Sequence, residues 1–95
     1  MPHAYVVGQM TVKNPAKWAE YRSQVLATLQ PWGGELVFRG HQVKALSGSC
    51  PHADVVVIRF PAVANADAWH ASAAYQALIP IRQEAADVVL LTYEA

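Results

Sequence analysis

Residues 64–82 lie between two strongly apolar runs, and this arrangement limits the fold more than any other part of the chain. The run before them, residues 54–60, is rich in β-branched side chains and ends at Pro61, which is typical of a buried strand. The run after them, Val-Val-Leu-Leu at residues 88–91, predicts another strand within residues 87–94. A helical connection starting near Val63 is therefore expected between two strands.

This connecting helix is expected to be interrupted twice. Ala62 offers no side-chain oxygen, so the start of the helix has a poor cap. Ser72 is expected to cap a second helical segment over residues 73–78. Pro80 lacks an N–H and disfavours a helical residue before it, which predicts a kink or restart near Ile79.

The N-terminal part of the chain predicts a strand followed by a helix. Residues 3–12 alternate, but both faces are largely apolar, so the strand is expected to be covered on both sides. Asn14 is expected to cap a helix that begins at Pro15 and ends near Pro31 and the glycines at 33–34. A single apolar stripe on this helix contains Trp18, Tyr21, Val25 and Leu29.

The middle of the chain predicts two short strands, residues 35–39 and 41–46, joined at Gly40. Gln42 and Lys44 would face water on the second of them, as side chains of an edge strand do.

The predicted order is strand, helix, strand, strand, helix, strand, which indicates a single α+β domain over residues 1–95. This is the βαββαβ order of ferredoxin-like domains, with both helices on one face of an antiparallel sheet. The other face has no helix to cover it, so a second copy packed sheet to sheet is expected, giving a two-fold dimer. The apolar residues expected on that face are Val7, Val37, Val55, Val57, Val89 and Leu91.

Composition excludes several classes of protein. Seven basic and seven acidic residues balance, which argues against binding to nucleic acid or an anionic membrane. No apolar run approaches the roughly 18 residues of a membrane span, and the N-terminus lacks the pattern of a signal peptide. The single Cys50 cannot form an internal disulfide. A cytoplasmic protein is the simplest expectation.

Several short motifs occur together along the chain. They are Tyr21-Arg22, Gly33-Gly34, Phe38-Arg39-Gly40, Ile58-Arg59-Phe60-Pro61, and Trp69 leading through Ser72 to Tyr75-Gln76. This combination resembles the bacterial DUF1330 proteins, small members of the dimeric α+β-barrel superfamily. The resemblance implies a homodimer whose two sheets form a barrel, with a pocket in each subunit. The family has no settled biochemical function, and no cofactor is expected.

Arg39 is the leading candidate for contact with a ligand. If Val37 points into the barrel, Arg39 does as well, and the same counting places Gln9 and Arg59 on that face. A guanidinium at the rim of an apolar cavity can hold a carboxylate through two parallel hydrogen bonds. The alternative is that Arg39 pairs with Glu35 across the dimer.

Trp69, Tyr75 and Arg82 form a second group of candidates. The two rings span the helix break and could flank the mouth of a pocket, with the Tyr75 hydroxyl reaching inside. The alternative is that Trp69 belongs to the core, as aromatic side chains on helices usually do. The four histidines are scattered and no pair has the spacing i, i+4, so a metal site is not expected.

Three functions fit these features. One is a dimer that binds a small acidic or aromatic molecule, and another is a cofactor-free monooxygenase or isomerase. The last is a structural or regulatory dimer with a filled barrel. Ligand binding or catalysis is favoured over the structural role, because Arg39, Arg59 and Gln9 would be costly on a buried face that held no ligand. Haem degradation, known among barrel relatives, is not expected because those relatives have an Asn where Gln9 stands.

Overall fold

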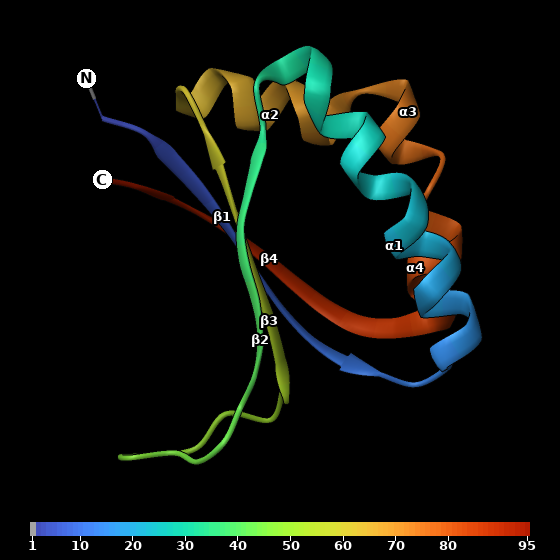
Figure 1. The fold of residues 1–95 in the computed structure, drawn as a ribbon, viewed down its shortest axis with the longest axis vertical. Coiled ribbons are helices and arrows are strands. Elements are labelled where there is room, and N and C mark those ends of the chain that lie inside the picture. Colours follow the sequence, from blue (N-terminus) through green and yellow to red (C-terminus); the bar gives the residue numbers. More distant parts are fainter. Residues whose placement is uncertain (1) are drawn as a thin grey trace.

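A computed structural model describes residues 2–95 of the chain, and its elements follow the order βαββαβ. One antiparallel sheet has the strand order β2-β3-β1-β4. All the helices lie on one face of it (Figure 1), so the predicted ferredoxin-like α+β fold is confirmed. The strands are β1 (Ala4–Val12), β2 (Glu35–His41), β3 (Asp54–Phe60) and β4 (Ala86–Glu94). The helices are α1 (Pro15–Leu29), the 3-10 helix η1 (Gln30–Trp32), α2 (Val63–Ala71), α3 (Ala73–Gln76) and α4 (Ile79–Ala85).

Helix α1 begins and packs as the sequence predicts. The Asn14 side-chain oxygen accepts a hydrogen bond from the backbone N–H of Lys17 at 3.1 Å, and Pro15 occupies the first helical position. Tyr21, Val25 and Leu29 are buried against the sheet, and Trp18 is half-buried beside them.

The break between α2 and α3 falls at Ser72, where the backbone is extended. The Ser72 hydroxyl donates to the Trp69 carbonyl at 2.6 Å and accepts from the Tyr75 backbone N–H at 3.3 Å. This confirms the predicted cap, although α3 ends at Gln76 and not at residue 78. The chain restarts as α4 at Ile79, as the following proline predicts.

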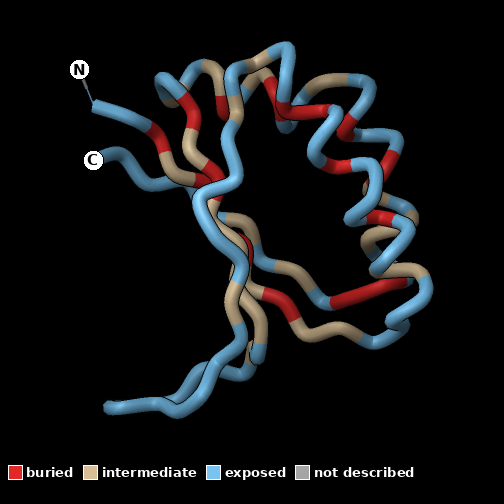
Figure 2. The backbone as a smooth tube through the Cα atoms, in the orientation of Figure 1, coloured by how far each residue is buried: buried red, intermediate tan, exposed pale blue. Residues whose placement is uncertain are grey.

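The core lies between the sheet and the helices, where the buried segments of the backbone gather (Figure 2). Its largest fully buried side chains are Trp69, Tyr75, Phe60 and Leu29. Gly34 allows the turn after η1 to pack against this core, because a Cβ there would lie 2.9 Å from the Phe60 ring. The turn thus sets where β2 enters the sheet.

Strand β2 differs from its prediction in two ways. It is one strand that passes through Gly40, which pairs with Val55, and it ends at His41. The two predicted strands, 35–39 and 41–46, are therefore wrong, because residues after 41 have no ladder partner beyond one bond between Gln42 N–H and the Ala53 carbonyl, 2.6 Å long. Gln42 and Lys44 are exposed as predicted, but they lie on an arm and not on a strand.

The second difference is a β-bulge. Leu36 pairs with Ile58 and Phe38 pairs with Val57, so Val37 is an extra residue with no partner on β3. One extra residue reverses which face the following side chains occupy. Phe38 therefore lies on the face away from the helices, and Arg39, opposite Val56, lies on the face toward them.

The face away from the helices, called here the open face, is apolar and exposed. Val7 is its centre, paired with Val57 on one side and Leu91 on the other. Val55 and Val89 flank Gln9 in the same way, which confirms five of the six residues predicted for this face. Val37, the sixth, is exposed but sits at the bulge and outside the alternation.

The arm, residues 42–53, leaves the end of β2 and β3 on the side of the sheet opposite the helices (Figure 1). Val43 and Leu46 on this arm are 91% and 88% exposed. Within residues 2–95, none of the helices is both long and apolar enough to cross a membrane.

Candidate ligand-binding site

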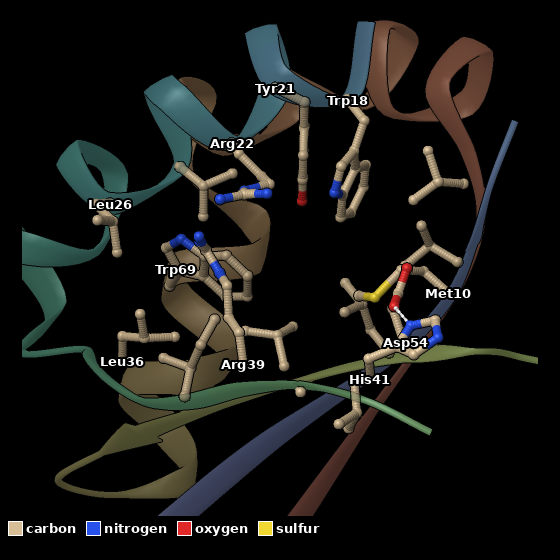
Figure 3. Close-up of a pocket in the computed structure, with 18 residues that line it drawn as sticks. Met10, Trp18, Tyr21, Arg22, Leu26, Leu36, Arg39, His41, Asp54 and Trp69 are labelled. Carbon is tan, nitrogen blue, oxygen red and sulfur yellow. Dashed lines mark hydrogen bonds and ion pairs between the residues drawn. The ribbon is translucent and has the colours of Figure 1, made fainter. Parts of the chain in front are cut away.

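A cavity of about 470 Å³ lies between the helix-facing side of the sheet and helix α1 (Figure 3). Most of its wall is apolar, and all four strands contribute to the floor while α1 forms the roof. The principal apolar side chains are Met10, Trp18, Val25, Leu26, Val56 and Leu90. A cavity of this size and character is typical of a small-molecule site.

Two arginines enter this cavity from opposite walls. Arg22 extends from α1 and Arg39 from β2, and their guanidinium groups point toward one another (Figure 3). Within residues 2–95, neither forms an ion pair with a carboxylate. Partial burial, together with the like charge of Arg22, lowers the pKa of Arg39. Two neighbouring cations with no acidic partner favour an anion between them.

The prediction that Arg39 shares a face with Gln9 and Arg59 is wrong. The bulge turns Arg39 toward the helices, while Gln9 and Arg59 stay on the open face. Arg59 donates to a Glu35 carboxylate oxygen at 2.6 Å, and this hydrogen bond raises the pKa of Arg59. Gln9 accepts from the Cys50 thiol at 3.4 Å. Within the chain Glu35 is paired with Arg59, and the alternative in which Arg39 pairs with Glu35 across the dimer stays a prediction.

Trp69 belongs to the core, the alternative considered for it, and its side chain also borders the cavity. Its indole N–H donates to the Thr28 hydroxyl at 3.0 Å, which fixes the ring at the back of the cavity.

Tyr75 and Arg82 lie behind the cavity wall and do not line it. The Tyr75 ring is fully buried against Trp69, with the ring centroids 4.2 Å apart. Arg82 donates to the Tyr75 hydroxyl at 2.9 Å, and the Tyr75 and Tyr21 hydroxyls share a hydrogen bond of the same length. The predicted placement of Tyr75 at a pocket mouth is therefore replaced by a supporting position behind Tyr21.

Tyr21 is the phenol that reaches the cavity. Its ring descends from α1 with the hydroxyl directed into the space above the sheet (Figure 3). Burial, and then the neighbouring Tyr75, raise the pKa of Tyr21, so its phenol stays protonated well above neutral pH. It can therefore act as a neutral hydrogen-bonding group beside the two arginines.

A histidine–carboxylate pair completes the polar lining. His41, the last residue of β2, faces Asp54, the first residue of β3, and its Nδ1 lies 2.7 Å from Asp54 Oδ1. Both side chains line the cavity, at the side away from the two arginines (Figure 3). Within residues 2–95, no group of three His, Cys, Asp or Glu side chains is placed to hold a metal ion.

The comparisons with known proteins agree with this architecture. The family model described as a domain of unknown function, DUF1330, matches residues 3–95. The chain belongs to the DUF1330 family. No curated protein sequence matches it.

Solved structures similar to this DUF1330 protein share its fold at low sequence identity. A protein of unknown function from Rhodopseudomonas palustris superposes with a TM-score of 0.81 at 18% identity, covering 98% of this chain and 82% of that chain. SnoaB, a cofactor-independent oxygenase from Streptomyces nogalater, gives 0.73 at 11% identity, with coverages of 100% and 94%. A dimeric ferredoxin-like protein of unknown function from Thermobifida fusca gives 0.67 at 13% identity, with coverages of 99% and 92%.

Sequence reasoning about this DUF1330 chain overlooked Arg22, His41 and Asp54. Arg22 follows Trp18 by four residues and precedes Leu26 by four, so helical spacing alone could have placed it on the cavity side of α1. To predict that His41 pairs with Asp54, one must know that β2 continues to His41. The prediction of two short strands joined at Gly40 did not include this.

Proposed function

We propose that this DUF1330 protein binds a small molecule with an anionic group and an apolar body, and that Arg22 and Arg39 hold the anionic group. The observation that carries the proposal is the pair of guanidinium groups on one side of a mainly apolar cavity, with no carboxylate paired to either among residues 2–95. A carboxylate or phosphoryl group can accept parallel hydrogen bonds from each planar guanidinium.

The apolar walls determine which non-polar group the rest of the ligand can have. Trp18, Leu26 and Leu36 surround the space next to the arginines, and these side chains suit a flat or branched hydrocarbon group. Tyr21 adds one neutral hydroxyl near the middle of the cavity. This combination favours an aromatic or aliphatic acid of modest size over a polyanion.

We further propose that the protein is a homodimer joined through the open face. Phe38, Val89, Leu91 and Tyr93 leave a large apolar area exposed on a single chain. The Thermobifida fusca neighbour is described as a dimeric ferredoxin-like protein, which supports a second copy as the occupant of this face. A two-fold arrangement would also bring the arms of both chains close to the opposite subunit.

A cofactor-free enzyme is the second candidate function. It is supported by the His41–Asp54 pair in the same cavity as the arginines, since a histidine held by a carboxylate is a common general base. SnoaB, with the same fold, is described as a cofactor-independent oxygenase. A structural dimer without a ligand is the weaker candidate, because a cavity of about 470 Å³ lies between the sheet and α1.

Thermal-shift and calorimetric titrations with benzoate, phenylacetate, phenylpyruvate and phenyl phosphate test the binding proposal. We expect at least one of these anions to stabilise the wild type. Arg39→Ala and Arg22→Ala should each weaken its binding by roughly ten- to a hundredfold, because a hydrogen bond to a charged group contributes about 1.5–3 kcal/mol. Arg59→Ala is the matched control, since it removes the same side chain from the opposite face of the sheet.

Each variant is compared with its own ligand-free midpoint, so that a change in stability alone does not count as a change in binding. Binding that Arg59→Ala weakens as much as Arg39→Ala, or no binding of any anion by the wild type, would contradict the proposed site.

A further inference from the structure

The His41–Asp54 pair has the geometry of a base held in one orientation. The Asp54 carboxylate can only accept a hydrogen bond, so the short contact of 2.7 Å places a hydrogen on His41 Nδ1. In the neutral imidazole, Nε2 then carries the free lone pair. Among residues 2–95, His41 is the one histidine paired with a carboxylate.

The position of this pair relative to the arginines matters for chemistry. Arg39 and His41 are two residues apart on the same face of β2, so their backbones are separated by roughly 6 to 7 Å. Both side chains line the same cavity, with the imidazole on the side away from the two guanidinium groups, so a molecule whose anionic group is held by Arg39 must extend across the cavity to bring a second atom to His41. The His41 side chain is 74% exposed, so a proton taken from such a molecule can pass to water.

We propose that His41 is a general base acting on an acid bound at Arg22 and Arg39, and that the substrate class is an aromatic 2-oxo acid or a similar enolisable carboxylate. This inference rests on the proposed anion site. In such a molecule the carboxylate meets the arginines, the ring meets the apolar wall, and the acidic C–H bond lies between them.

The step conserves atoms and electrons without any added oxidant or cofactor. The C–H bond next to the keto group breaks, and the proton goes to His41 Nε2. The electron pair forms a carbon–carbon double bond, while the keto oxygen becomes an enolate oxygen. Returning a proton to the same carbon regenerates the keto acid, so in heavy water the substrate exchanges this hydrogen for deuterium. The charge that develops on the enolate is stabilised by the two guanidinium groups and by the protonated Tyr21 hydroxyl.

Asp54 is a positioning residue in this scheme, because it acts only through His41. It fixes the tautomer of the imidazole and stabilises the imidazolium that forms during the step. Its removal should therefore lower the turnover number and leave the Michaelis constant nearly unchanged, whereas removal of Arg39 should raise the Michaelis constant first.

Phenylpyruvate in heavy water is the probe, with loss of its methylene proton signal followed by NMR and its binding measured by calorimetry. We expect the wild type to accelerate exchange over buffer, and His41→Gln to lose this acceleration by roughly a hundredfold or more. His3→Gln, which alters an exposed histidine near the start of β1, should exchange at the wild-type rate. Asp54→Asn should reduce the rate, and Asp54→Glu should restore part of it.

The outcomes separate the two proposals. Arg39-dependent binding of phenylpyruvate, with exchange that is equal in wild type and His41→Gln, overturns the base and leaves the anion site standing. Failure of phenylpyruvate to bind, or binding that ignores Arg39, overturns the base for this substrate class, and the anion site falls with it only if benzoate, phenylacetate and phenyl phosphate also show no Arg39-dependent binding. If His41→Gln does not fold, an Asp54→Asn variant that exchanges as fast as the wild type overturns the base by itself.

Discussion

Tyr21 and Tyr75 share a buried hydrogen bond at the centre of the molecule, and Arg82 donates to the same pair from outside. The arrangement keeps the Tyr21 phenol protonated in the folded chain, since burial raises its pKa above the ordinary value of 10.0. In the unfolded chain the same phenol titrates normally. The folded state therefore binds more protons than the unfolded state above pH 10, and the free energy of unfolding must fall as the pH rises there.

Tyr21→Phe removes this proton linkage. The full stabilisation linked to the Tyr21 proton is present below pH 10 and is lost as the pH rises from the unfolded pKa toward the raised folded pKa. We expect the alkaline slope of the unfolding free energy to be shallower in the variant by about 1.4 kcal/mol per pH unit. Urea titrations between pH 9 and 11.5 measure this slope. Equal slopes in both proteins would show that the phenol titrates normally in the folded state.

Ser72 joins two helical segments through a single hydroxyl, which both donates to the end of α2 and accepts from the start of α3. Ser72→Ala removes both bonds and should lower the free energy of unfolding by about 1 kcal/mol, the usual cost of losing a helix cap. Ser72→Asp keeps the acceptor and should recover part of the loss. Denaturant titrations of the three proteins give the comparison. An alanine variant as stable as the wild type would mean that packing of Trp69 and Tyr75 alone sets the break.

The elements were predictable to different degrees. The order of elements, the caps at Asn14 and Ser72 and the restart near Ile79 follow from local chemistry: a side-chain acceptor, a missing N–H, an apolar stripe. The path of β2 did not follow from local chemistry. A β-bulge depends on how two strands pair, and a valine at position 37 does not by itself indicate one in the sequence.

The error in the path of β2 also affected the prediction of the candidate site. Arg39 lines the cavity, but alternation without the bulge placed it on the same face as Gln9 and Arg59. Its neighbours in the cavity, Arg22 and His41, come from other segments or from the far end of the strand. These residues are brought into one cavity by tertiary packing, which residue spacing along one segment does not predict.

At the scale of the whole molecule, the open face determines the state of association that we propose. Val57→Lys places a charge near the centre of this face, next to Val7, and should convert a dimer into a monomer, because a buried, unpaired ammonium is costly. Ala74→Lys on the exposed side of α3 is the matched control. Sedimentation should then give twice the chain mass of 10.4 kDa for the wild type and control, and the single mass for Val57→Lys. A wild type that sediments as a monomer at micromolar concentration would rule out the interface.

The extra residue at Val37 has a consequence for protein engineering and for sequence alignment. It divides β2 into two segments in which the alternation of faces is reversed. Glu35 can therefore pair with Arg59 on the open face, while Arg39 lines the cavity on the helix-facing side. A mutant library that assigned faces by counting through the whole strand would randomise interface positions in place of cavity positions. A related chain lacking this one residue would need a gap there for its cavity side chains to align with those of this protein. Deleting Val37 would remove the extra residue and restore regular alternation along β2 with Arg39 still opposite Val56, so that faces could then be assigned by counting through the whole strand.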